Sequence, residues 1–170
     1  MTEGVDEKLV VMACAVFVSC CALATSIWQA YAARKHNRLS VTPHLTTWFN
    51  EWYSDKKFEL ILMNNGVGPA KITSFKVYVD GVVLEGVRSN ILKQAVAKLF
   101  DGYNYSSAQS FLGRTYSMRV NESCELLNIE FHGDSPTEAQ MEKIIRRLDI
   151  QIDYASMYEQ SFKLSLHEEM

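Results

Sequence analysis

The stretch Leu9–Tyr31, LVVMACAVFVSCCALATSIWQAY, decides how the rest of this chain is organised. Its 23 residues carry no charge, and a helix of about 20 apolar residues crosses the hydrocarbon core of a bilayer. A cleaved signal peptide has a basic segment before a shorter apolar core, whereas three acidic residues and one lysine precede this run. The helix of a soluble core shows a polar stripe, which is missing here. The sequence therefore predicts a single transmembrane helix over residues 9–33, after a short tail of residues 1–8.

Basic residues follow the apolar run directly and predict its direction in the membrane. Three of them outweigh Lys8 on the other side, and cytoplasmic flanks carry the excess of positive charge. We therefore expect residues 1–8 outside the cytoplasm and residues 34–40 as a basic juxtamembrane linker to a cytoplasmic domain. The expected anchors at the bilayer surface are Trp28, Tyr31, Arg34, Lys35 and Arg38.

One face of the apolar helix carries small and polar residues at intervals of three and four. Such a seam lets two membrane helices approach closely and hydrogen-bond across the contact. The seam consists of Ala15, Ser19, Ala22, Ser26 and Gln29. It predicts a homo-oligomer through the helix, with the alternative that Ala and Ser are merely frequent in this run.

Residues 41–170 are enough for one compact domain. From Leu39 onward the chain has 13 Lys and Arg against 17 Asp and Glu, a balance of −4, so nucleic-acid binding is not expected. Three of the four cysteines lie in the apolar run, which leaves Cys124 without a partner for a disulfide within the domain. This cysteine usage is compatible with a reducing compartment.

Short alternating segments bounded by turn residues predict a mainly-β domain. The expected strands cover residues 40–53, 57–63, 70–79, 82–84, 115–120, 126–131, 148–154 and 162–166. Asp80-Gly81 is a favoured two-residue hairpin turn between the third and fourth of these strands.

The segment from Leu60 to Gly81 resembles a pattern in small uncharacterised bacterial membrane proteins. The likeness rests on Leu60-x-Leu62-x-Asn64-x-Gly66-x-Gly68-Pro69-Ala70-x-Ile72 and Asp80-Gly81. Those proteins have one N-terminal helix before a β-sandwich-like domain, so the resemblance implies this architecture and a bacterial inner-membrane setting, and no activity. Asn-x-Gly turns between strands also recur in immunoglobulin-like domains, and we expect a sandwich of that kind. The glycine pair lacks the Lys-Ser/Thr of a phosphate loop, so no nucleotide site is expected.

Two amphipathic helices are expected among the strands. Residues 90–100 place apolar residues on one face and Lys93 and Lys98 opposite, so this helix either covers a sheet end or meets a partner or a membrane. The second helix starts at Ser135-Pro136-Thr137-Glu138, where Ser135 as N-cap and Glu138 at N3 match a capping box.

Residues 103–113 combine aromatic with small polar residues, which is typical of adaptable recognition loops. The alternative is an ordinary loop whose tyrosines pack on the sheet. With the lysines of the first helix, the candidate partner contacts are Lys93, Lys98, Tyr103, Tyr105 and Phe111.

No motif in the sequence predicts catalysis. The four histidines are dispersed, and zinc, nucleotide and nucleophile-elbow motifs are all missing. Cys124 and His132 would lie on opposite sides of a strand, and an exposed strand face accounts for Asp149 and Asp153. We therefore expect a non-enzyme with no catalytic residue, metal or cofactor.

These features together predict a membrane-anchored scaffold or sensor subunit that recruits or assembles protein partners at the bilayer, because tethering raises their effective concentration. Two alternatives stay open. One is an oligomerising effector that perturbs the bilayer, for instance in antiviral defence, and the other is an anchored domain that faces the periplasm.

Overall fold

The computed structural model describes residues 3–87 and 90–169 of the chain. Helix α1 (Glu3–Leu39) occupies the first of two compact units, residues 1–40, and a β-rich domain forms the second, residues 41–170. The basic segment that was expected as a linker is helical as far as Leu39.

The uncharged part of helix α1, residues 9–31, is apolar on every side. Within it, residues 8–39 are long and apolar enough to cross a membrane, with a mean hydropathy of 2.3 in the most apolar window, and none of that window is buried. Leu9, Phe17 and Ile27 are each more than 60% exposed. An unburied helix that is apolar all round is stable when lipid covers it, so the structure supports α1 as a membrane anchor.

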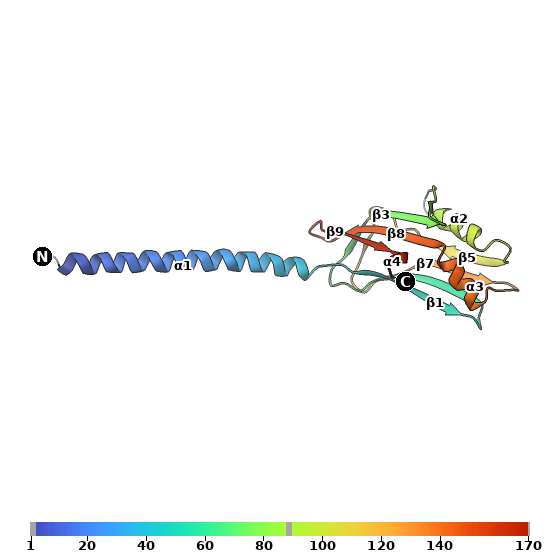
Figure 1. Cartoon of the computed structure of the whole chain (residues 1–170), viewed down its shortest axis with the longest axis horizontal. Helices are drawn as coiled ribbons and strands as arrows, with labels where there is room; N and C mark the ends of the chain where they lie inside the picture. The colour runs from blue at the N-terminus through green and yellow to red at the C-terminus, as the bar shows by residue number, and fades with distance from the viewer. Residues whose placement is uncertain (1–2, 88–89, 170) are drawn as a thin grey trace. The chain divides into compact units, whose positions relative to one another are not determined.

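Two antiparallel sheets make up the domain (Figure 1). Sheet A has the order β1 (Leu45–Trp52), β2 (Lys57–Asn64), β7 (Ser123–Phe131) and β5 (Tyr105–Gln109). Sheet B has the order β4 (Val82–Val83), β3 (Ala70–Val79), β8 (Leu148–Ala155) and β9 (Ser161–Ser165), and β6 (Ser117–Met118) also pairs with β3.

The strand orders are those of an immunoglobulin-like sandwich. With β6 set aside and the strands lettered along the chain, sheet A reads A-B-E-D and sheet B reads C′-C-F-G. Alternate residues of both sheets meet in one hydrophobic core; in β2 these are Phe58, Leu60 and Leu62. The prediction of an apolar N-terminal helix before a mainly-β, immunoglobulin-like domain is confirmed.

The chain changes sheets through two helices. Helix α2 (Asn90–Leu99) lies between β4 and β5, and α3 (Glu138–Ile145) lies between β7 and β8. The buried face of α2 consists of Ile91, Leu92, Ala95, Val96 and Leu99. Helix α2 therefore packs its apolar face onto the core. Covering the sheet in this way was one of the two roles expected for this helix. A short helix, α4 (Leu166–Glu169), ends the described chain.

Three local predictions are wrong. Residues 105–109 form strand β5 rather than a loop, because the exposed edge of β7 pairs with this polar segment. The strand expected over residues 115–120 is only Ser117–Met118, since the Glu122 side chain accepts a hydrogen bond from the Arg119 amide and turns the chain there. The N-cap of α3 is Thr137, whose amide donates to the Gln140 side chain at 2.9 Å, whereas Pro136 is buried ahead of the helix.

Candidate partner-binding surfaces

The predicted membrane residues all lie exposed on α1. The seam residues are Ala15, Ser19, Ala22, Ser26 and Gln29, and the anchors are Trp28, Tyr31, Arg34, Lys35 and Arg38. The Ser19 hydroxyl donates to the Ala15 carbonyl at 2.7 Å, and the Ser26 hydroxyl donates to the Ala22 carbonyl at 2.8 Å. Because both hydroxyl hydrogens are used within the helix, these two serines favour close approach of helices over strong interhelical hydrogen bonds.

The predicted contacts in the domain differ in exposure. Lys93 and Lys98 are exposed on α2, whereas the three aromatic rings are only partly exposed. Tyr103 and Tyr105 pack edge-on against Phe131, and Phe111 packs against Phe75. The two tyrosines therefore pack on the sheet, which was the alternative expected for this segment.

Asn64 explains much of the motif that carried the family resemblance. Its side chain is fully buried at the end of β2. The amide nitrogen Nδ2 lies within hydrogen-bond distance of the carbonyls of Gly68 (2.9 Å), Met118 (3.3 Å) and Arg119 (3.1 Å), and Oδ1 accepts from the amides of His44 (3.2 Å) and Gly66 (3.1 Å). One side chain therefore joins three segments that are distant in sequence.

The two glycines of the motif lie under the segment that leads into β1. A Cβ at Gly68 would stand 1.9 Å from the Val41 carbonyl oxygen, and one at Gly66 would stand 2.2 Å from the His44 nitrogen. Backbone hydrogen bonds from Asn65 to His44 and from Val67 to Thr42 hold the same segment. We call residues 41–44, Asn64 and the 66–68 turn the junction clamp. Its glycines permit backbone-to-backbone contact, which accounts for them without a ligand.

A tryptophan-bearing surface lies on the outer face of sheet A, although two tryptophans so close in sequence more often indicate core or membrane-proximal packing than a ligand platform. In β1, Trp48 is 61% exposed and Trp52 is 40% exposed, and they lie opposite Ile61 and Lys57 of β2. Tryptophan is highly buried on average in folded domains, so two exposed rings on one strand are informative. The two tryptophans, with Ile61 and Lys57, define what we call the tryptophan face.

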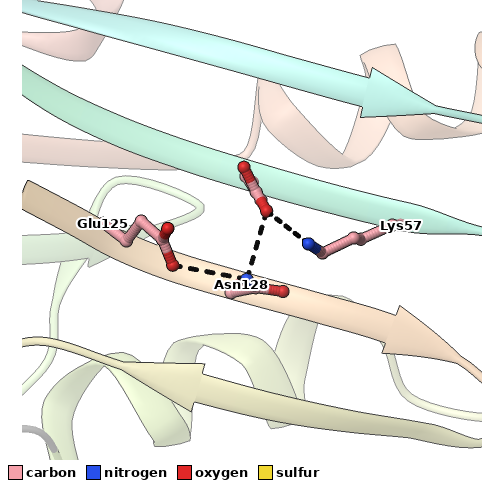
Figure 2. Close-up of polar contacts among 4 residues, drawn as sticks. Lys57, Glu125 and Asn128 are labelled. Carbon is pink, nitrogen blue, oxygen red and sulfur yellow. Dashed lines mark hydrogen bonds and ion pairs between the residues drawn. The ribbon is translucent and has the colours of Figure 1, made fainter.

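A polar network continues the tryptophan face across β2 and β7 (Figure 2). Glu59 is only 6% exposed, and its carboxylate lies 2.6 Å from the Lys57 ammonium and accepts from the Asn128 amide at 3.2 Å. Asn128 also donates to Glu125, and the Lys57 ammonium lies 5.5 Å from the centre of the Trp52 ring. These contacts hold Lys57 beside Trp52 and join the tryptophan face to β7.

A groove of about 680 Å³ lies on the other side of β1, between that strand and helices α3 and α4. Phe49 and Ile145 give it apolar walls, and Tyr53 and His167 also line it. Three carboxylates and one guanidinium complete the lining, namely those of Glu51, Glu138, Glu142 and Arg146. We call this feature the acidic groove.

One carboxylate of the acidic groove accepts a hydrogen bond from a tyrosine. The Tyr53 hydroxyl donates to the Glu51 carboxylate. Partial burial, together with this hydrogen bond, raises the pKa of Tyr53 above its ordinary value. The phenol therefore stays neutral at physiological pH and leaves the negative charge on Glu51.

The pairs considered for chemistry lie apart or have structural roles. Cys124 is half-buried against the core, and burial raises the pKa of its thiol, whereas exposed His132 contacts the Ser106 hydroxyl. The expectation that Asp149 lies on an exposed strand face is wrong, because the residue is buried. Its carboxylate accepts from Ser165 at 3.1 Å and from the His167 amide at 3.4 Å, so it holds the end of β9 and the start of α4. Across residues 3–87 and 90–169, no three His, Cys, Asp or Glu side chains are grouped as a metal site would need.

Comparison with known proteins does not assign this chain to a family. No protein-family model matches the chain, and no curated protein matches it. Among solved structures, the archaellum periplasmic stator protein FlaG from Sulfolobus acidocaldarius matches at 10% identity over 73% of this chain and 99% of that chain, with a TM-score of 0.27. That score does not establish a common fold, so FlaG supports no conclusion about this chain.

Proposed function

We propose that this protein is a membrane-anchored, non-enzymatic adaptor whose immunoglobulin-like domain binds a partner protein through the tryptophan face. The exposure of Trp48 and Trp52 on one ordered strand carries the proposal. Tryptophan is enriched among the residues that dominate binding energy, and such residues lie on well-ordered surfaces surrounded by polar groups. Lys57 and the buried Glu59 carboxylate supply polar surroundings of that kind.

The anchor supports the same function. Helix α1 has the length and hydropathy of a membrane span, and a tethered domain meets membrane-bound partners at a high effective concentration. Only contacts at the tryptophan face then need to be specific. A partner of modest intrinsic affinity is sufficient for recruitment.

Site-specific photo-crosslinking in the cells that express the chain tests this function. A benzophenone side chain is placed at Trp48 and, as a control, at Lys76, an exposed residue on the outer face of sheet B. We expect a protein adduct from position 48 that Trp52→Ser weakens, and none from position 76. Equal adducts from both positions, or adducts with lipid alone from position 48, would refute a partner-binding tryptophan face.

We further propose that the domain faces the cytoplasm of a bacterial cell, since the positive charge at Arg34, Lys35 and Arg38 favours retention on that side. Cys124 is a poor reporter because it is half-buried with a raised thiol pKa. A Lys163→Cys variant places an exposed thiol on β9 instead. It should react with a membrane-impermeant maleimide only after the membrane is opened, and reaction in intact cells would place the domain outside.

Self-association through the seam is a second, compatible proposal. It rests on the exposed Ala15, Ala22 and hydroxyl-bearing residues along one face of α1. Leucine at Ala15 and Ala22 should abolish a crosslinked dimer if the seam forms it.

A further inference from the structure

The acidic groove differs from the tryptophan face in position and in chemistry. Its β1 side is formed by Phe49 and Glu51, whereas the tryptophans of the same strand alternate to the outer face of sheet A. Among the described strands, β1 is the last on its side of the sheet, so no neighbouring strand covers it there. On the opposite side, Glu138, Glu142 and Ile145 follow one another at intervals of four and three along α3.

The charges in the groove are not balanced. The Arg146 guanidinium lies 2.7 Å from the Glu142 carboxylate, so this pair is neutral as a unit. Among residues 3–87 and 90–169, the Glu51 side chain bonds the neutral Tyr53 hydroxyl, and neither Glu51 nor Glu138 has an ion-pair partner. Two negative charges therefore stand at the rim of a cavity whose walls include Phe49 and Ile145.

We propose that the acidic groove binds a short polypeptide segment in which an apolar side chain is flanked by lysine or arginine. The apolar side chain contacts Phe49 and Ile145, where it loses water-exposed area. The flanking cations pair with Glu51 and Glu138. The volume of about 680 Å³ lies within the range of cavities that bind small ligands and a few side chains.

Titration of peptides against the isotope-labelled full-length chain in a nonionic detergent tests this proposal. The probe is the pentapeptide acetyl-Lys-Leu-Lys-Leu-Lys-amide, and amide shifts report binding at β1 and α3. One comparison peptide replaces every Lys with Glu, and another replaces every Leu with Ser. We expect saturable shifts beside Phe49 and Ile145 with the Lys-Leu peptide only, because the groove requires both charge and an apolar side chain.

A matched pair of double variants locates the site on the protein. Glu51→Gln with Glu138→Gln removes both unbalanced charges, and two exposed ion pairs of roughly 0.2–1 kcal/mol each convert to a roughly two- to thirtyfold weaker affinity. Glu85→Gln with Glu159→Gln removes the same net charge from exposed positions that line neither the acidic groove nor the tryptophan face, and it should leave the affinity unchanged.

Three results would overturn the proposal: equal weakening in both double variants, binding of the Glu peptide, or equal binding of the Lys-Ser peptide. The peptide comparisons alter only the probe, so they remain decisive even where a variant folds poorly. Crosslinking from Trp48 is independent of these residues. A failure here therefore leaves the adaptor function untouched, and the reverse also holds.

Discussion

Replacement of Asn64 by alanine should destabilise the domain more than any exposed substitution near it. The side chain is fully buried, and its amide and carbonyl reach five backbone groups, three in the junction clamp and two at Met118 and Arg119. In the alanine variant, those backbone amides and carbonyls stay away from water and lose the Asn64 side chain as their hydrogen-bond partner. The loss falls on the segment that leads into β1 and on the chain beside β6.

The expected loss of stability follows from the number of hydrogen bonds that the Asn64 side chain makes at the same time. Nδ2 has two hydrogens for three carbonyls, and Oδ1 accepts two amides, so four bonds form together. A buried hydrogen bond contributes about 1 kcal/mol net, so Asn64→Ala should lower the free energy of unfolding by roughly 2–4 kcal/mol. Asn65 is exposed and bonds only Thr46 with its side chain, so Asn65→Ala should cost about 0.5 kcal/mol.

Urea titration of the full-length chain in a nonionic detergent, followed by far-UV circular dichroism, measures both losses. Asn64→Asp distinguishes hydrogen bonding from packing, because aspartate keeps the volume but turns a carboxylate oxygen toward three carbonyl oxygens. We expect Asn64→Asp to lose at least as much stability as Asn64→Ala. A wild-type midpoint for Asn64→Asp, or equal midpoints for Asn64→Ala and Asn65→Ala, would refute the role given to this side chain.

The remaining predictions concern the turn glycines and an ion pair. Gly68→Ala should cost roughly 1–3 kcal/mol in the same titration, since its Cβ would meet the Val41 carbonyl, whereas Gly113→Ala, with open space around it, should change the midpoint little. The hydrogen bonds from Arg147 (2.7 and 2.8 Å) lower the pKa of Asp80 below its ordinary value of 3.8. This pair therefore stabilises the fold above about pH 4 and loses its effect as pH falls through the lowered pKa, so Asp80→Asn should flatten the acid limb of a stability-against-pH curve. An unchanged acid limb in Asp80→Asn would count against the pair.

Strong periodicity made most of the sandwich predictable from the sequence. The strand predicted over residues 57–63 is β2, and the structure places its Phe58, Leu60 and Leu62 in the core. Asp80 and Gly81 both have positive φ, as the predicted two-residue hairpin turn requires. Strand order was beyond the sequence, because it depends on which distant strands pair.

The errors arose where tertiary contacts override local signals. Tyr105–Gln109 has no apolar alternation, and it is a strand because β7 offers an edge to pair with. Pro136 is a favourable first helical residue, but it is buried before α3, and the helix begins after Thr137 instead. A pattern of charges cannot reveal the acidic groove either, since Glu51 and Glu138 meet there from opposite ends of the domain sequence.

The junction clamp links the anchor to the proposed adaptor function. Residues 41–44 are the first of the domain after α1, and Asn64, Gly66 and Gly68 bond or contact them directly. Any load between membrane and partner enters the domain through this segment and continues into β1, which carries both tryptophans. Backbone hydrogen bonds and a buried amide resist such a load better than side-chain packing alone, because each has a defined direction and length. The motif therefore keeps β1 in register with β2, and that register is what sets Trp48 and Trp52 on the outer face.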